Sequence, residues 1–164
     1  MSTTFSFAHI THLSIDASSD YVQFTTKLEA ILGRLDFAIL SQVMENPEFV
    51  KNAIINQMQG ASELILFNQY DHGSLLNIWG KPRKAKQYLI GNPYTASTMT
   101  RYDIRAGLYA PLRVLVFERD DKKARVEYDL PSSLFGQFGI PEVTSEGIGL
   151  DRKMERLIKE TDTK

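Results

Sequence analysis

Two short segments joined by a short run of charged residues restrict the fold of this chain most strongly. Residues 111–118 and 124–129 each have the length and the apolar content of a strand, and Asp120-Asp121-Lys122-Lys123 connects them. Two such segments with a short polar connection predict a β-hairpin. Because the strands of a hairpin pair antiparallel, we expect a sheet that is antiparallel at least in this part.

Apolar residues at helical spacing predict helices on both sides of this hairpin. Ser18, Ser19 and Asp20 can cap a helix in which Tyr21, Phe24 and Leu28 recur, and the sequence Asn46-Pro47-Glu48 is typical of another helix start. The expected helices are residues 20–33, 46–60, 94–101 and 145–161, with a further short helical turn from residue 35 to residue 43. Opening and central strands are expected at residues 5–15, 64–67 and 85–90.

Strands and helices do not alternate regularly along the chain. We therefore expect an α+β fold, a two-layer sandwich in which a mainly antiparallel sheet packs against helices, rather than a doubly wound parallel fold. With 164 residues the chain is expected to form a single domain, residues 1–164. Residues 71–79 fit either a strand or a short helix, and residues 135–139 are expected to form a loop.

Composition excludes several classes of function. The chain has no cysteine, which removes disulfides, thiolate nucleophiles and cysteine-ligated metals, and its net charge of −1 gives no general attraction to nucleic acid or acidic membranes. No secretory signal and no apolar run of about 20 residues is present, so we expect a cytoplasmic protein without a membrane partner. The Walker, dinucleotide-binding, nucleophile-elbow and zinc-protease motifs are also missing, and we expect no cofactor.

The histidines give few metal or catalytic sites. His9 and His12 are three residues apart on an expected strand and face opposite sides, so a three-histidine metal site with His72 has little support. His72 itself follows Asp71, and an imidazole next to a carboxylate suits proton transfer near neutral pH. The alternative is structural: Asp71 caps a turn and His72 bonds a backbone carbonyl.

Polar side chains between residues 70 and 109 provide candidates for ligand binding. The turn Gly91-Asn92-Pro93 is either a structural turn or a place where backbone amides hold an anion. The arginines of this region match carboxylate or phosphate with paired hydrogen bonds, or form salt bridges to Asp103, Glu118 or Asp129. The candidate ligand-binding residues are Gln87, Asn92, Arg101, Arg105 and Arg113, and Tyr88 or Tyr109 can donate a hydrogen bond to an oxyanion.

The cations Lys81, Arg83, Lys84 and Lys86 fall within six residues. They could contact phosphate, but no motif of stacking aromatic residues accompanies them and the chain is net negative, which favours a solvated loop. We therefore expect no nucleic-acid partner.

Four blocks of the chain, in this order and spacing, resemble the domain-of-unknown-function family number 302. They are Tyr70–Gly73, Tyr88–Pro93, Ala110–Glu118 and Glu127–Asp129. The resemblance runs from Leu66 to Gly139 and covers nearly half of the chain closely. It implies a small α+β fold with helices packed on an antiparallel sheet, and a homodimer, but no activity.

Two hypotheses for the function follow. In the first, the protein binds a small acidic or polar organic molecule in a hollow where the loops of Asp71, Asn92 and Arg101 meet. In the second, it is a cofactor-free enzyme of the isomerase, dehydratase or cyclase type, in which His72, Asp71 and Tyr109 carry the acid–base chemistry and an arginine holds the substrate. An interaction subunit without a ligand is the third, simpler alternative.

Overall fold

The computed structural model describes residues 1–58 and 63–163, and its centre is a six-stranded sheet in the order β1-β6-β5-β4-β3-β2. Every neighbouring pair is antiparallel except β2 and β3. The strands are β1 (His12–Asp20), β2 (Gly33–Arg34), β3 (Ile65–Asp71), β4 (Ala85–Gly91), β5 (Leu112–Glu118) and β6 (Lys123–Asp129). The β5–β6 pair is the predicted hairpin.

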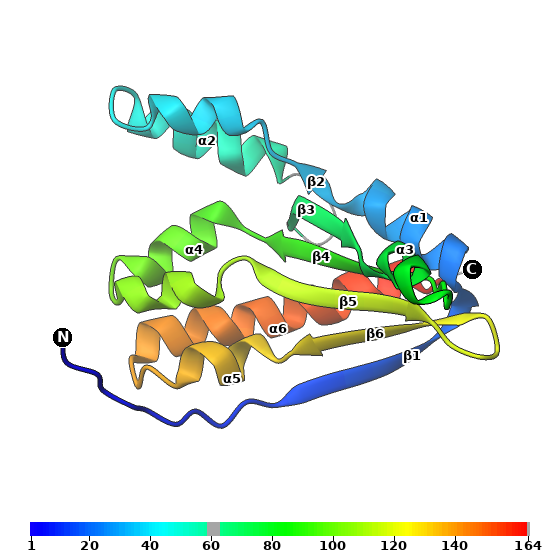
Figure 1. Ribbon diagram of the computed structural model, residues 1–164. Coiled ribbons are helices and arrows are strands. Elements are labelled where there is room, and N and C mark those ends of the chain that lie inside the picture. The colour runs from blue at the N-terminus through cyan, green and yellow to red at the C-terminus, as the bar shows by residue number, and fades with distance from the viewer. Residues whose placement is uncertain (59–62, 164) are drawn as a thin grey trace.

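Helices cover one face of this sheet, and Figure 1 shows α6 running behind β5 and β6. Alternate strand residues such as Tyr88, Val114 and Val126 are buried on that face, where they pack with Phe24 and Met154 of the helices. The α-helices are α1 (Tyr21–Ile31), α2 (Pro47–Gln57), α3 (His72–Leu75), α4 (Pro93–Thr100), α5 (Pro131–Gly136) and α6 (Pro141–Thr161). The α+β fold expected from the sequence is therefore confirmed.

The other face of the sheet is only partly covered. Successive strand residues point to opposite faces, so Gln87, Arg113, Arg125 and Glu127 lie opposite the core and are exposed or half-buried. The 3₁₀ helices η2 (Leu76–Trp79) and η3 (Ile104–Tyr109) follow α3 and α4. Along the described part of the chain, no helix is both long and apolar enough to cross a membrane.

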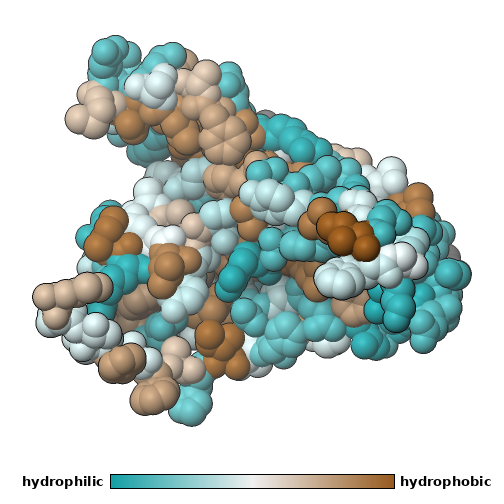
Figure 2. All heavy atoms as spheres, in the orientation of Figure 1, coloured by the Kyte–Doolittle hydropathy of each residue, from teal (hydrophilic) through white to brown (hydrophobic). Residues whose placement is uncertain are grey.

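A second, smaller apolar cluster holds an arm made of η1 (Phe37–Gln42) and α2. Its buried members are Leu35, Val50, Ile54, Met58 and Ile65. Figure 2 shows apolar side chains along this arm and a notch between it and the part of the molecule below. The helical turn predicted near residues 35–43 and the helix start at Pro47 are both present.

Local signals in the sequence set several of these boundaries. The Asp20 carboxylate accepts a hydrogen bond from the Gln23 backbone N–H at 2.8 Å, which caps α1 as predicted. The ambiguous segment 71–79 is helical, because the Asp71 carboxylate caps α3 in the same way through the Ser74 N–H.

Three boundaries differ from the sequence-based expectation. The opening strand covers residues 12–20 instead of 5–15, because only the later residues pair with β6, while residues 1–11 are exposed. The loop expected at 135–139 overlaps α5, since Pro131 both ends the strand region and occupies the first turn of a helix. The last helix starts at Pro141, four residues before the expected Ser145, for the same reason.

Candidate functional site

Two cavities lie on either side of the segment Ala110–Pro111, whose peptide bond is cis. Both cavities include these two residues in their walls. One cavity opens on the partly covered face of the sheet and contains charged side chains, and we call it the polar cavity. The other lies among the helices at the end of the sheet, and we call it the apolar cavity.

The polar cavity has a volume of about 280 Å³. Apolar side chains form most of its wall, and three polar side chains reach it from η3, β5 and β6. The lining residues are Leu89, Leu108, Tyr109, Ala110, Pro111, Arg113, Asp129 and Leu134. Two residues expected from the sequence to act at a site, Tyr109 and Arg113, therefore lie together here.

Arg113 reaches this cavity because of strand alternation. Its neighbours Leu112 and Val114 are buried in the core, so the Arg113 side chain lies on the opposite face, across from Leu89 of β4. Within the described residues, its guanidinium makes no hydrogen bond or ion pair with another side chain or with the backbone. Its five N–H donors are therefore left for solvent or a ligand.

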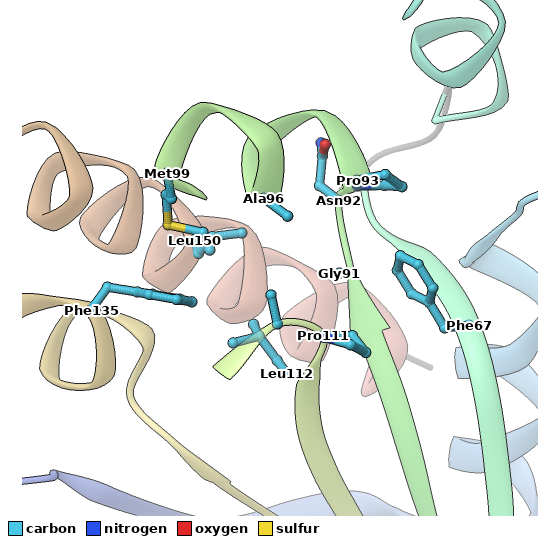
Figure 3. Close-up of a pocket in the computed structure, with 11 residues that line it drawn as sticks. Phe67, Gly91, Asn92, Pro93, Ala96, Met99, Pro111, Leu112, Phe135 and Leu150 are labelled. Carbon is cyan, nitrogen blue, oxygen red and sulfur yellow. The ribbon is translucent and has the colours of Figure 1, made fainter. Parts of the chain in front are cut away.

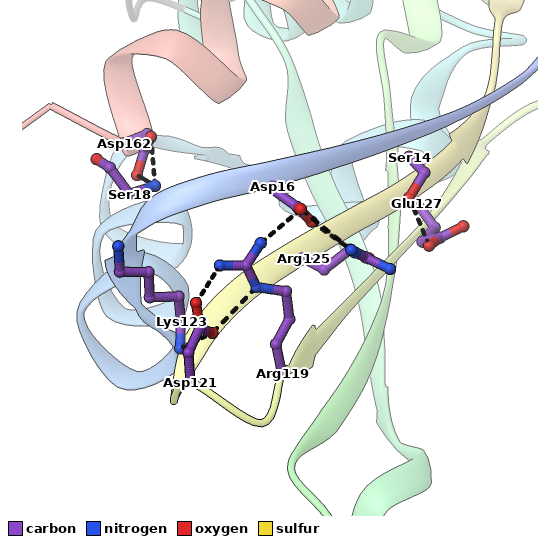
Figure 4. A network of polar contacts seen from close by, with 9 residues as sticks. All are labelled: Ser14, Asp16, Ser18, Arg119, Asp121, Lys123, Arg125, Glu127 and Asp162. Carbon is purple, nitrogen blue, oxygen red and sulfur yellow. Dashed lines mark hydrogen bonds and ion pairs between the residues drawn. The ribbon is translucent and has the colours of Figure 1, made fainter.

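The other arginines on this face are already paired, as Figure 4 shows. Arg125 donates to Asp16 from Nε at 2.6 Å, and Arg119 pairs with both Asp16 and Asp121 at 2.5 Å. These ion pairs hold β1 and the β5–β6 hairpin together at the end of the sheet far from the cavity. Arg113 differs from them because no carboxylate saturates it.

Tyr109 closes one side of the polar cavity. Its ring stands edge-on to Phe138, with ring centroids 6.1 Å apart, and its hydroxyl donates to the Gln137 side-chain oxygen at 3.3 Å. The hydroxyl oxygen keeps its acceptor capacity for a ligand donor. Packing against Phe138 fixes the ring, so Tyr109 gives the cavity a rigid wall.

His12, the first residue of β1, is hydrogen-bonded to the Asp129 carboxylate of the neighbouring strand β6. The His12 Nδ1 is 2.9 Å from the Asp129 carboxylate, and its Nε2 is 2.6 Å from the Glu127 carboxylate. These two hydrogen bonds, first to Asp129 and then to Glu127, raise the pKa of His12 above its ordinary value of 6.5. Local sequence patterns do not indicate this cluster, because His12 is more than 110 residues away from both carboxylates.

This cluster makes the stability of the protein depend on pH. A raised pKa means that the protonated ring stabilises the folded state fully below pH 6.5, and this contribution is lost as the pH rises through the raised pKa. The His12 side chain is 55% exposed, so we expect a loss of only about 0.3–1 kcal/mol between pH 6 and pH 8.5. Urea unfolding of the wild type and of His12→Gln at both pH values measures it.

His72→Gln is the matched control for that measurement, because His72 is exposed and lies outside the cluster. The control is expected to keep the pH dependence of the wild type, whereas His12→Gln loses it. Equal pH dependence in the wild type and His12→Gln would contradict the assignment.

The apolar cavity has a volume of about 230 Å³ and is shown in Figure 3. Its wall includes Asn92, a residue that the sequence proposed for ligand binding. The Asn92 carboxamide accepts from the Thr95 N–H at 2.9 Å and donates to the Glu63 carbonyl at 3.1 Å. The amide oxygen thus caps α4, and the amide nitrogen ties this turn to the residue Glu63 before β3. These bonds give Asn92 the structural role that is the alternative to ligand binding.

The remaining sequence candidates lie apart from these cavities. Asp71 is the last residue of β3 and pairs with Lys86 near the start of β4, whereas Asn92 follows the other end of β4. Six strand residues span about 20 Å, so the structure does not bring Asp71, Asn92 and Arg101 to one hollow. Asp71 caps α3 and His72 is exposed, and the acid–base hypothesis gains no support from this arrangement.

Two of the candidate arginines have partners of their own. Arg105 binds the Asp103 carboxylate through Nε and Nη2, at 3.0 and 2.5 Å, which is the salt-bridge alternative considered above. Arg101 lies over the ring of Tyr102, with 4.7 Å between guanidinium carbon and centroid, and donates to its hydroxyl. Gln87 lies on the partly covered sheet face, opposite Leu115.

A partly buried polar cluster on the helix-covered side is structural. The Glu29 carboxylate accepts from the Lys86 ammonium and from the Tyr88 hydroxyl, both at 2.9 Å. Burial and the contact with Glu29 raise the pKa of Tyr88. Tyr88, one of the two tyrosines considered as oxyanion donors, therefore anchors α1 to β4.

Across residues 1–58 and 63–163, no group of three or more His, Asp or Glu residues could hold a metal ion.

Comparison with known proteins gives a family and a fold. A family model described as "Domain of unknown function DUF302" matches residues 42–161. A solved structure, described as an uncharacterized conserved protein DUF302 from Bacillus stearothermophilus, is similar with a TM-score of 0.63 and 13% identity, over 91% of this chain and 96% of that chain. At this identity the likeness shows the fold. No curated protein matches.

Proposed function

Since this chain belongs to the DUF302 family, whose description assigns no function, we propose a function from its geometry: it binds a small organic acid in the polar cavity. One observation carries this proposal. Arg113 offers a guanidinium without an internal partner to a cavity whose other walls are mostly apolar. Such a combination of one charged anchor and apolar surface is typical of sites for small organic ligands.

The chemistry of the lining residues narrows the ligand. A guanidinium binds a carboxylate through two parallel hydrogen bonds, and Leu89, Leu108 and Leu134 can cover an apolar body attached to it. The volume of about 280 Å³ suits a compact molecule. Asp129 lies in the same wall and repels a second negative group, which favours a monocarboxylate over a dicarboxylate.

Loss of the Arg113 charge is expected to weaken this binding strongly. A hydrogen bond to a charged group contributes about 1.5–3 kcal/mol, so Arg113→Gln should raise the Kd of a monocarboxylate about 10- to 100-fold. Butyrate and benzoate serve as probes in isothermal titration calorimetry. Arg113→Lys should retain part of the affinity, since it keeps the charge without the planar pair of donors.

Arg101→Gln is the matched control, because Arg101 is an exposed arginine that does not line the polar cavity. It is expected to bind both probes as the wild type does. Equal weakening by Arg101→Gln and Arg113→Gln, or a wild type that binds neither probe, would count against the proposal.

A further inference from the structure

We propose that the apolar cavity is a second binding site, separate from Arg113, for a small uncharged apolar molecule of the size of one aromatic ring or a short branched alkyl chain. This second site differs from the proposed organic-acid site in the side chains that line it and in the chemistry of the ligand it would bind.

Rigid elements build the wall of this cavity. Figure 3 shows side chains from β3, α4, β5, α5 and α6 converging on one space. The apolar lining residues are Phe67, Pro93, Ala96, Met99, Ala110, Pro111, Leu112, Phe135 and Leu150. Met99, Leu112, Phe135 and Leu150 belong to the buried core, so the inner wall is part of the packed interior.

The cavity offers no polar side chain to a ligand. Asn92 is the one polar side chain in its wall among the described lining residues, and both ends of its amide are bound to Thr95 and Glu63. In Figure 3 the Asn92 amide points away from Leu150 and Leu112. A charged or strongly polar ligand would lose its hydration here without a replacement hydrogen bond, which is unfavourable. The chemistry therefore selects an uncharged apolar ligand.

The size of the cavity agrees with this chemistry. An engineered apolar cavity of about 150 Å³ stays dry and binds benzene. The volume here is about 230 Å³, which gives room for one ring with a small substituent. Protein cores are normally packed without voids of this size. An open apolar space against the core is consistent with a site that a ligand fills.

Two small residues keep the space open. Ala96 on α4 contributes only a methyl group to the wall of the cavity (Figure 3). Gly91 at the end of β4 has no side chain, and a Cβ there would stand 3.4 Å from both Phe67 Cε2 and Pro111 Cβ, in ordinary contact. Larger side chains at these positions would fill the cavity, so a substitution there can test whether a ligand binds in it.

The test uses toluene as the probe and follows the methionine methyl groups by NMR in ¹³C-methyl-methionine protein. Toluene is expected to shift the methyl signal of Met99, which lines the cavity, and to leave that of Met44, which is 90% exposed, unchanged. Ala96→Leu should fill the cavity and weaken toluene binding at least 10-fold. Ala30→Leu, at an exposed position of α1, is the matched control and should bind as the wild type does.

A further variant distinguishes this proposal from the proposed organic-acid site. Arg113→Gln should bind toluene with unchanged affinity, so failure of one site leaves the other intact. A Met99 signal that toluene does not move, or equal toluene affinity in Ala96→Leu and the wild type, would overturn the proposal. It would also be overturned if the Met99 signal moved with protein concentration in the absence of toluene, because a second copy would then occupy the cavity.

Discussion

Replacing Phe24 with alanine is expected to lower the free energy of unfolding by about 3–5 kcal/mol. Phe24 has no exposed surface and lies on α1 at the centre of the main core. The substitution removes a whole ring from between the strands and α6. The space left behind cannot close fully, because sheet pairing holds the strands in register. Urea unfolding followed by circular dichroism measures the loss.

Val22→Ala, two residues earlier on the same helix, is the control for this prediction. Val22 is 55% exposed, so its truncation removes little buried surface and should change the free energy of unfolding by no more than about 0.5 kcal/mol. A similar effect of the two substitutions would mean that α1 does not pack on the sheet as described.

Gly147→Ala is expected to destabilise the protein by about 1–3 kcal/mol, although alanine is the better helix former. Gly147 lies in α6 where α5 crosses it. An added Cβ would stand 3.0 Å from the Ser132 Cα and 3.2 Å from the Phe135 Cβ. Because these are a backbone atom and the root of a buried side chain, α5 would have to move away from α6. Thermal and urea unfolding report the effect.

Gly149→Ala, in the same helix, is expected to change the free energy of unfolding in the opposite direction. No atom outside its chain neighbours and helix backbone lies within 4 Å of a Cβ built there, so the substitution should stabilise the protein by about 0.5–1 kcal/mol through the lower entropy of the unfolded chain. If both glycine substitutions stabilised the protein, the close contact between α5 and α6 would be wrong.

The open question of function concentrates on the two cavities beside Ala110–Pro111. One offers a cation without a partner, and the other offers only apolar surface. The two sites use different residues and are tested with different probes, benzoate and toluene. The homodimer implied by the resemblance and the cytoplasmic location stay predictions, and sedimentation at several protein concentrations would test the first.

Part of the candidate site was within reach of sequence reasoning. The chemistry of Arg113 and Tyr109 predicts that they act at a site, and both line the polar cavity. Arg105 has the same chemistry but is satisfied two residues away by Asp103. Sequence alone does not distinguish an arginine that is satisfied from one that is free, because the distinction depends on which carboxylates the fold brings near it.

By itself, the sequence determined the elements that neighbouring residues encode. The β5–β6 hairpin, the Asp20 cap of α1 and the Pro47 start of α2 each depend on contacts within a few residues. Only the tertiary structure decided that His12 meets Asp129, that the Asn92 loop lies far from His72, and that two cavities share Pro111. Those relations depend on strand order and register, which are set by packing across the whole chain rather than by local preference.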